Sequence, residues 1–221
     1  MDPCFHVVAA DCSIHGKFAV QARELASGQK DIKVIVGKTM IDVISVSANS
    51  PIEVRMDREP DFTVVKTEKA VLISAPLYGL QSLVFDNTHA MAIQLNPLVT
   101  KGHMCGLCGN FNMQFKDDIQ GPKTCMYSKP EIEAAAYRIP NSPAGCEAVK
   151  PLSQSIKDQL QKESTQCLKP TFIPTKVRIF CLLNVLCIKN RTNLSNVFTT
   201  VFGTIFNASD VIRVIIIVRH V

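Results

Sequence analysis

The sequence predicts a mainly β protein, an antiparallel sandwich-like domain stapled by disulfides, with one or two short helices toward the carboxyl end. Three observations lead to this fold class. Short β-branched runs recur at spacings of about ten residues through residues 1–95, as in all-β domains. Residues 96–125 then break the pattern with a loop region rich in Gly, Asn, Asp and Cys. Nine cysteines, seven of them within residues 1–170, suggest a disulfide framework.

The strand pattern is regular. Apolar and polar side chains alternate in Ile52-Glu53-Val54-Arg55-Met56, which is the period of a half-buried strand. A Gly37-Lys38 turn separates two β-branched runs. The predicted strands cover residues 31–36, 40–46, 52–56, 62–66, 71–75, 81–85 and 91–95.

Two helices are predicted after this β region. Ser128 is expected to cap the first helix, because it stands three residues before Glu131 with Pro130 inside the first turn. A second helix is expected from about residue 153 to residue 166. In it Ile156 and Leu160 share one face, and we expect that narrow apolar stripe to pack on the chain's own domain.

Charge argues against nucleic-acid binding. The net charge of +5 comes entirely from residues 171–221, which hold six Lys/Arg and one Asp. Residues 1–170 are neutral, so no basic field extends over the body of the chain.

The tail of residues 171–221 changes in composition. Val, Ile, Leu and Phe make up 25 of its 51 residues, yet no run reaches the ~20 apolar residues of a membrane span. We interpret this tail as disordered or mis-translated, with an appended β-segment as the alternative. Its three glycosylation sequons begin at Asn190, Asn193 and Asn207.

The segment Cys105-Gly106-Leu107-Cys108-Gly109-Asn110-Phe111-Asn112, followed by Asp117-Asp118, is the densest signal for function. Zinc would need further soft ligands, and redox exchange would need a helix that Gly106 and Gly109 disfavour. Structural disulfides are the favoured role for cysteines of this kind, namely Cys12, Cys105, Cys108, Cys125, Cys146 and Cys167. Hard oxygen ligands for calcium could come from Asn110, Asn112, Asp117 and Asp118, although Asn and Asp are also common in turns.

This segment resembles the signature of von Willebrand factor type D domains, in several of which the matching Asn and Asp positions bind calcium. Met113 stands where that family often has Gly. Few cysteines follow the segment, and the stretch of residues 121–138 looks like the carboxyl-terminal end of insect vitellogenins. The resemblance covers about residues 12–169. Asp86-Asn87-Thr88-His89 occupies the place of a common Asp-Gly-x-Arg motif and keeps only its Asp.

The resemblance implies three parts: a truncated type D domain over residues 1–125, a helical extension over residues 126–170, and the doubtful tail. It also implies a secreted glycoprotein of the yolk, serving as a nutrient reservoir and lipid transporter. Lipid would be carried only by the full-length protein, whose lipid-carrying domains and oocyte receptor would be the partners. No enzyme activity is expected. Residues 1–4 do not resemble a signal peptide, so we expect the native amino-terminal region to precede Met1. The alternative is an extracellular adhesive or mucin-type module.

Overall fold

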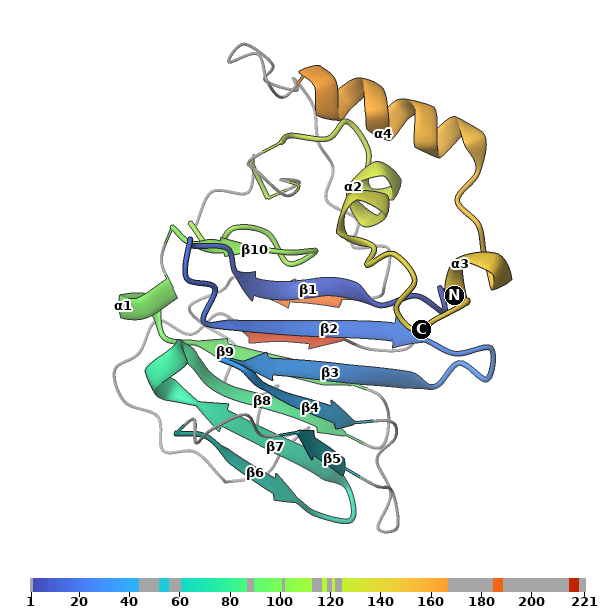
Figure 1. Cartoon of the computed structure of the whole chain (residues 1–221). Helices are drawn as coiled ribbons and strands as arrows, with labels where there is room; N and C mark the ends of the chain where they lie inside the picture. Colours follow the sequence, from blue (N-terminus) through green and yellow to red (C-terminus); the bar gives the residue numbers. More distant parts are fainter. Residues whose placement is uncertain are drawn as a thin grey trace.

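The computed structural model describes residues 2–43, 52–55, 61–86, 90–100, 102–112, 117–118, 121, 125–166, 185–188 and 215–218. Within these residues the strands form two six-stranded antiparallel sheets (Figure 1). Helices α2 and α4 lie along one side of the sheets, beyond strands β1 and β10 (Figure 1). The mainly β, antiparallel fold class predicted from the sequence is confirmed.

The first sheet contains most of the amino-terminal half of the chain. Its strand order is β10-β1-β2-β3-β4-β5, so β1 pairs with both its sequence neighbour and the much later β10. The Gly37-Lys38 turn joins β3 to β4 in a tight hairpin, with Val36 opposite Thr39. The bounds are β1 His6–Asp11, β2 Phe18–Glu24, β3 Lys30–Val36, β4 Thr39–Val43, β5 Ile52–Arg55 and β10 Met104–Cys105.

The second sheet has the order β11-β12-β9-β8-β7-β6. A short 3₁₀ turn, η1 (Pro76–Tyr78), links β7 to β8, and the single-turn helix α1 (Pro97–Thr100) follows β9. The bounds are β6 Thr63–Lys66, β7 Ala70–Ala75, β8 Leu80–Asp86, β9 Met91–Leu95, β11 Val185–Ile188 and β12 Ile215–Val218. All the strands predicted between residues 31 and 95 are present.

The carboxyl-terminal tail contributes two of these strands. β11 and β12 pair with each other, and β12 pairs with β9 from Ile215 opposite Gln94 to Val218 opposite Met91. The remaining residues between 171 and 221 lie outside the described part of the chain, so the interpretation of this tail stays a prediction. The sequons at Asn190, Asn193 and Asn207 lie outside the described residues.

Side chains from both sheets form one apolar core. The alternating pattern puts Val20, Val34 and Ile41 of the first sheet into the same buried cluster as Ile73 and Phe85 of the second. Each of these five side chains is at most 2% exposed. Burial of apolar side chains is worth about 1.5–3 kcal/mol for each residue of this size, so this core is the main source of stability.

Three helices follow the β region: α2 (Pro130–Tyr137), α3 (Cys146–Val149) and α4 (Gln154–Gln166). Both longer helices were predicted, but the expected Ser128 cap was wrong. Lys129 is the residue at the cap position of α2 and makes no side-chain cap. The Ser128 backbone N–H and hydroxyl instead donate to the buried Glu163 carboxylate of α4.

Candidate functional site

The Gly-rich loop, defined as residues 105–118, begins as an edge strand on β1. Cys105 lies opposite Ala10, and the backbone N–H groups of Leu107 and Cys108 continue the contact by donating to Val7 and Val8 oxygens at 3.1 Å. Gly106 has φ +127°, and a Cβ there would lie 2.4 Å from the Val8 oxygen. Glycine is therefore required at this position, because any side chain would push the loop off β1.

Phe111 anchors the middle of the Gly-rich loop. Its backbone has φ 59°, and its side chain joins the core between the sheets with 7% exposure. A left-handed conformation is uncommon for a residue other than glycine, so burial of the aromatic ring must offset the backbone strain. The neighbours Asn110 and Asn112 are consequently held in place beside the core.

Hydrogen bonds connect the asparagines of the Gly-rich loop to Asp117. The Asn110 side-chain amide donates to the Asp117 backbone oxygen at 3.3 Å, and the Asn112 amide donates to Asp117 Oδ2 at 2.6 Å. Asn110 Oδ1 in turn accepts from the Asn112 backbone N–H at 3.1 Å. Asp117 Oδ1 is buried and accepts no hydrogen bond within the described part of the chain.

Asp118 completes the group of four predicted ligand residues. Its carboxylate occupies the space beside Gly109, where a Cβ would lie 2.5 Å from Asp118 Oδ1. Gly109 has φ +81°, and its N–H donates to the Gly106 oxygen at 2.9 Å. The structure thus brings Asn110, Asn112, Asp117 and Asp118 together in one small region.

Helix α2 covers this region with two buried side chains. Glu133 and Tyr137 are four residues apart and therefore share a helix face, at 6% and 3% exposure. Burial, with a smaller contribution from the Asp118 carboxylate, raises the pKa of Glu133 to about 8. Burial also raises the pKa of Tyr137, opposed by a hydrogen bond from the Gly106 backbone.

Sequence reasoning missed Glu133 and Tyr137. Their spacing shows only that they share a face of α2, and nothing local indicates that this face meets the Gly-rich loop. Among the described residues, no group of three or more His, Cys, Asp or Glu side chains is arranged as a metal site. The Gly-rich loop does bring side-chain oxygens of Asn110, Asn112, Asp117 and Asp118 into one region, and oxygen atoms are the hard donors that calcium takes.

The disulfides agree in part with the predicted set. Cys12 is bonded to Cys105 and Cys146 to Cys4, a cysteine that sequence reasoning had not placed among the bridges. Cys125 is also disulfide-bonded, and Cys167 lies outside the described residues.

Cys108 takes part in neither of the two bridges between described residues, and its side chain packs against the core between the sheets. The Cys105 sulfur is joined to Cys12, so the C-x-x-C spacing does not form the mutual pair that redox exchange would use.

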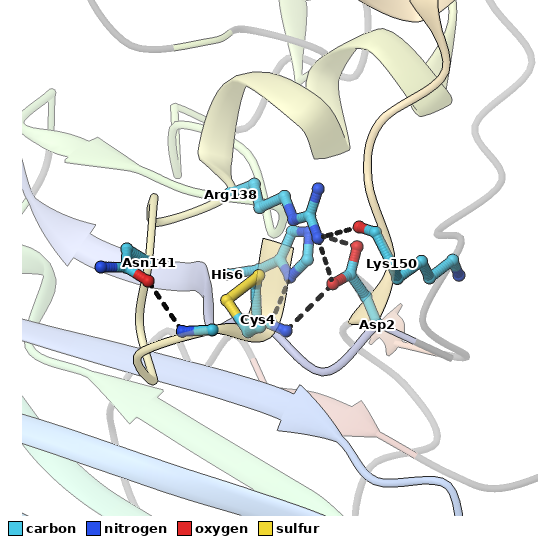
Figure 2. Close-up of a disulfide and its surroundings, with 8 residues drawn as sticks. Asp2, Cys4, His6, Arg138, Asn141 and Lys150 are labelled. Carbon is cyan, nitrogen blue, oxygen red and sulfur yellow. Dashed lines mark hydrogen bonds and ion pairs between the residues drawn. A yellow bond between two sulfur atoms is a disulfide. The ribbon is translucent and has the colours of Figure 1, made fainter. Parts of the chain in front are cut away.

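The Cys4–Cys146 bridge fastens the helical extension to β1 (Figure 2). Backbone hydrogen bonds lie on either side of it: the Phe5 N–H donates to the Ser142 oxygen at 2.7 Å, and the Ile139 N–H donates to the Phe5 oxygen at 2.8 Å. The segment after α2 therefore runs beside the start of β1 and is covalently held there.

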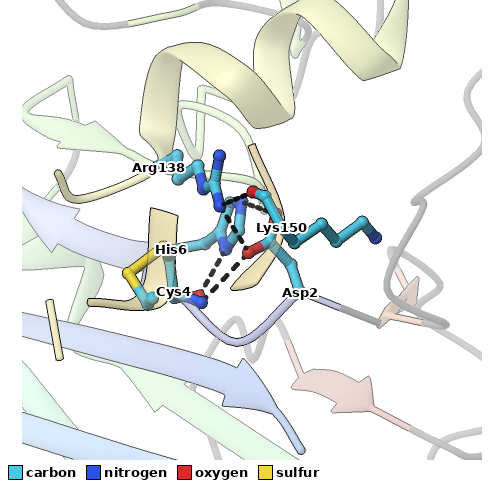
Figure 3. Close-up of polar contacts among 6 residues, drawn as sticks. Asp2, Cys4, His6, Arg138 and Lys150 are labelled. Atoms are coloured by element: carbon cyan, nitrogen blue, oxygen red, sulfur yellow. Dashed lines mark hydrogen bonds and ion pairs between the residues drawn. A yellow bond between two sulfur atoms is a disulfide. The ribbon is translucent and has the colours of Figure 1, made fainter. Parts of the chain in front are cut away.

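Buried polar groups fill the space beside this bridge (Figure 3). Asp2 lies 3.3 Å from the Arg138 guanidinium and 3.7 Å from His6 Nε2, while His6 Nδ1 contacts the Cys4 oxygen at 3.1 Å. Arg138 also donates to the Lys150 backbone oxygen. Burial lowers the pKa of His6, although the Asp2 carboxylate opposes that change.

Helix α4 packs on α2 through a second, smaller apolar cluster. Ile156 and Leu160 contact the buried side chains of Cys125, Tyr127 and Ile132. This confirms the prediction that the apolar stripe of α4 packs on its own domain.

Two antiparallel sheets, a Gly-rich loop hydrogen-bonded to the first strand and a disulfide from that loop define a disulfide-stapled, β-rich module. The model of the von Willebrand factor type D domain family matches residues 2–124. The chain therefore belongs to this family.

Vitellogenins from several species are homologues of the chain. Vitellogenin-1 of Solenopsis invicta is 23% identical over 168 residues, covering 72% of this chain and 10% of that protein. Vitellogenin-A2 of Xenopus laevis is 30% identical over 135 residues, covering 54% of this chain and 7% of that protein. The predicted resemblance to a carboxyl-terminal vitellogenin region is confirmed.

A different relative matches a shorter stretch of the chain. The human IgGFc-binding protein is 38% identical over 68 residues, which is 31% of this chain and 1% of that protein. The chain thus spans about a tenth or less of these relatives. The families it matches are non-enzymatic. None of the described helices has the length and apolar character needed to cross a bilayer.

Proposed function

We propose that this chain is part of a secreted, vitellogenin-like yolk precursor that stores nutrients and transports lipid. Its own role is that of a non-catalytic, disulfide-stapled domain. The observation that carries the proposal is the extent of the match to the Solenopsis invicta vitellogenin-1, which covers 168 residues and so exceeds the type D match over residues 2–124. The disulfides suit an oxidising, extracellular compartment.

In this role the domain acts through its rigidity. The Cys12–Cys105 and Cys4–Cys146 bridges join segments 93 and 142 residues apart in sequence. A disulfide that closes so long a loop restricts the unfolded chain strongly, and each such bridge stabilises the folded state by about 2–5 kcal/mol. A domain held in this way would protect the carboxyl-terminal part of a circulating precursor until uptake by an oocyte receptor.

The proposal is tested on the parent protein. The complete open reading frame is expressed in insect cells with and without residues 1–170, and secreted protein and co-purifying lipid are measured. We expect lipid to accompany the secreted parent protein, and we expect deletion to reduce secretion more than lipid per molecule. A parent protein that encodes cysteine-dense modules in place of lipid-carrying domains would refute the yolk assignment.

That outcome would favour an adhesive or mucin-type module instead. The 38% identity to the human IgGFc-binding protein over 68 residues is the observation that keeps this second function in view.

We also propose that the Gly-rich loop binds Ca²⁺. The side-chain oxygens of Asp117 and Asp118 would supply the charge, and those of Asn110 and Asn112 would complete the set. Support comes from the buried Asp117 Oδ1, which accepts no hydrogen bond within the described part of the chain. A bound cation would also offset the repulsion between Asp118 and Glu133.

Calorimetric titration with CaCl₂ tests this proposal on the whole chain. Asp117→Ala and Asp118→Ala should abolish the binding heat, whereas Asp158→Ala, which removes an exposed carboxylate on α4, should leave it unchanged. Addition of EDTA should lower the melting temperature of the wild type but not of the two loop variants. Negligible heat with the wild type would remove the calcium proposal and leave the yolk assignment untouched.

A further inference from the structure

One end of the two-sheet body is formed by four connected segments, which we call the apolar end: residues 12–17, the turn 37–38, residues 76–79, and residues 96–100 with 102–103. The Gly37 N–H donates to the Lys17 oxygen at 2.8 Å, and the Cys12 N–H donates to the His103 oxygen at 2.7 Å. A Cβ on Gly37 would lie 3.2 Å from the Tyr78 ring. Figure 1 shows α1 and the β1–β2 connection at this same end.

Large apolar side chains project from the apolar end into solvent. Ile14 and Leu98 are each 94% exposed, and Leu77 is 66% exposed. Each comes from a different connection, so together they form separate apolar tips rather than a flat face. Exposure of this extent is unusual for three large aliphatic residues gathered at one end, and it indicates a site of interaction.

The charged residues among these tips are basic. Lys17 and Lys38 are exposed, and His15 and His103 are exposed beside them. The described residues of the four segments hold no carboxylate. Asp11 stands just before the first segment, is 8% exposed, and accepts the Ser13 and Lys17 backbone N–H groups at 3.0 Å. Another carboxylate, Asp61, is exposed just before the edge strand β6 and lies outside the four segments.

We propose that the apolar end docks on an anionic phospholipid surface. The tips of Ile14, Leu77 and Leu98 would enter the boundary between headgroups and acyl chains, and Lys17 and Lys38 would contact the lipid phosphates and carboxylates. Apolar tips combined with lysines match the two forces that hold a peripheral protein on an anionic bilayer. The inference depends on neither the calcium loop nor the yolk assignment.

Vesicle co-sedimentation of the 221-residue chain tests the proposal. One set of vesicles contains phosphatidylcholine and phosphatidylserine in equal parts, and the other contains phosphatidylcholine alone. Ile14→Ser with Leu98→Ser should lower partitioning onto anionic vesicles by at least about tenfold, since each tip buries a full aliphatic side chain. The matched control is Val65→Ser with Val149→Ser, which removes exposed apolar side chains elsewhere, at 50% and 77% exposure.

Charge is tested with Lys17→Glu and Lys38→Glu, matched by Lys69→Glu and Lys157→Glu at exposed positions outside the apolar end. The first pair should lower partitioning by about tenfold or more and the second pair much less. All variants alter exposed side chains, and unchanged thermal unfolding verifies their folding.

Four results would overturn the proposal: no sedimentation of the wild type, equal sedimentation with both vesicle types, variants that bind like the wild type, or controls that lose binding equally. A dimer in light scattering that Ile14→Ser with Leu98→Ser dissolves, without vesicle binding, would assign the apolar end to a second copy and likewise overturn it.

Discussion

The absence of a side chain at Gly109 makes room for the Asp118 carboxylate. A Cβ at Gly109 would lie 2.5 Å from Asp118 Oδ1 and 2.8 Å from its carboxyl carbon, both well inside contact distance. Glycine is thus required at position 109 for two reasons: the backbone has φ +81°, and the Asp118 carboxylate occupies the space that a side chain would fill. This close approach holds the end of the Gly-rich loop against Gly109.

We therefore expect Gly109→Ala to destabilise the chain more than the backbone strain alone requires. Gly102→Ala is the matched control, because Gly102 has the same φ of +81° and nothing within 4 Å of its added Cβ. The control should cost about 1–2 kcal/mol, and Gly109→Ala should cost at least about 1 kcal/mol more. Urea unfolding measures both, and equal losses would show that the Asp118 contact carries no energy.

Removal of the Cys4–Cys146 bridge should loosen the helical extension. The double variant Cys4→Ala with Cys146→Ala should lower the free energy of unfolding by about 2–5 kcal/mol. Limited proteolysis should then cleave first between residues 139 and 166, because this segment is held to β1 there. Cys108→Ala leaves the Cys4–Cys146 and Cys12–Cys105 bridges intact and should cost about 1 kcal/mol. Indistinguishable digestion patterns for the double variant and the wild type would contradict the proposed fastening role.

Glu133 should make the protein less stable as pH rises from about 4.5 to about 8. Its folded-state pKa of about 8 lies above the ordinary value of 4.5. Between these values the folded chain keeps a proton that the unfolded chain has lost, so rising pH favours unfolding. Glu133→Gln removes this ionisation. At pH 8 the free energy of unfolding of the variant should therefore exceed that of the wild type by at most about 4 kcal/mol.

The measurement is urea unfolding across this pH range in EDTA, so that a cation cannot mask the charge of Glu133. Glu131→Gln is the control, since Glu131 is exposed on the same helix. A Glu133→Gln variant with the same pH slope as wild type would show that this carboxyl ionises normally.

His6 should make the protein less stable as pH falls, which is opposite to the effect of Glu133. Burial lowers the pKa of the folded-state imidazole below 6.5, so the unfolded chain takes up a proton first as pH falls. Stability from this site is complete above about pH 6.5 and is lost as pH falls through the folded-state pKa. The loss is at most about 1.4 kcal/mol for each pH unit.

The loss of folding stability at acid pH should depend on the charged groups that face His6. Protonation would place a cation beside Arg138 and the Lys150 side chain, with Asp2 as the opposing anion. His6→Gln should flatten the pH slope between pH 6.5 and the acid limb, and His103→Gln, at an exposed position, should not. If both variants keep the wild-type slope, another group governs acid sensitivity.

The sequence alone determined the mainly β architecture and the Gly-rich loop. Alternation of apolar and polar residues is a local property, so the runs from residue 31 to residue 95 reveal strands without knowledge of their partners. The Gly and Asn residues of the signature likewise report local backbone demands, including the positive φ at Gly106 and Gly109. The stripe of Ile156 and Leu160 also predicted where α4 would pack.

Tertiary structure decided the features that join distant segments. Cysteine spacing is compatible with many pairings. Cys4–Cys146 was selected by the hydrogen bonds of Phe5 to the segment after α2, and Cys12–Cys105 by the pairing of β1 with β10. Glu133 became a buried carboxyl because α2 lies on the Gly-rich loop. Ile14 and Leu98 are 84 residues apart in sequence and lie at one end of the body because the Cys12–His103 hydrogen bond joins their segments, a relationship that no periodicity in the sequence reveals.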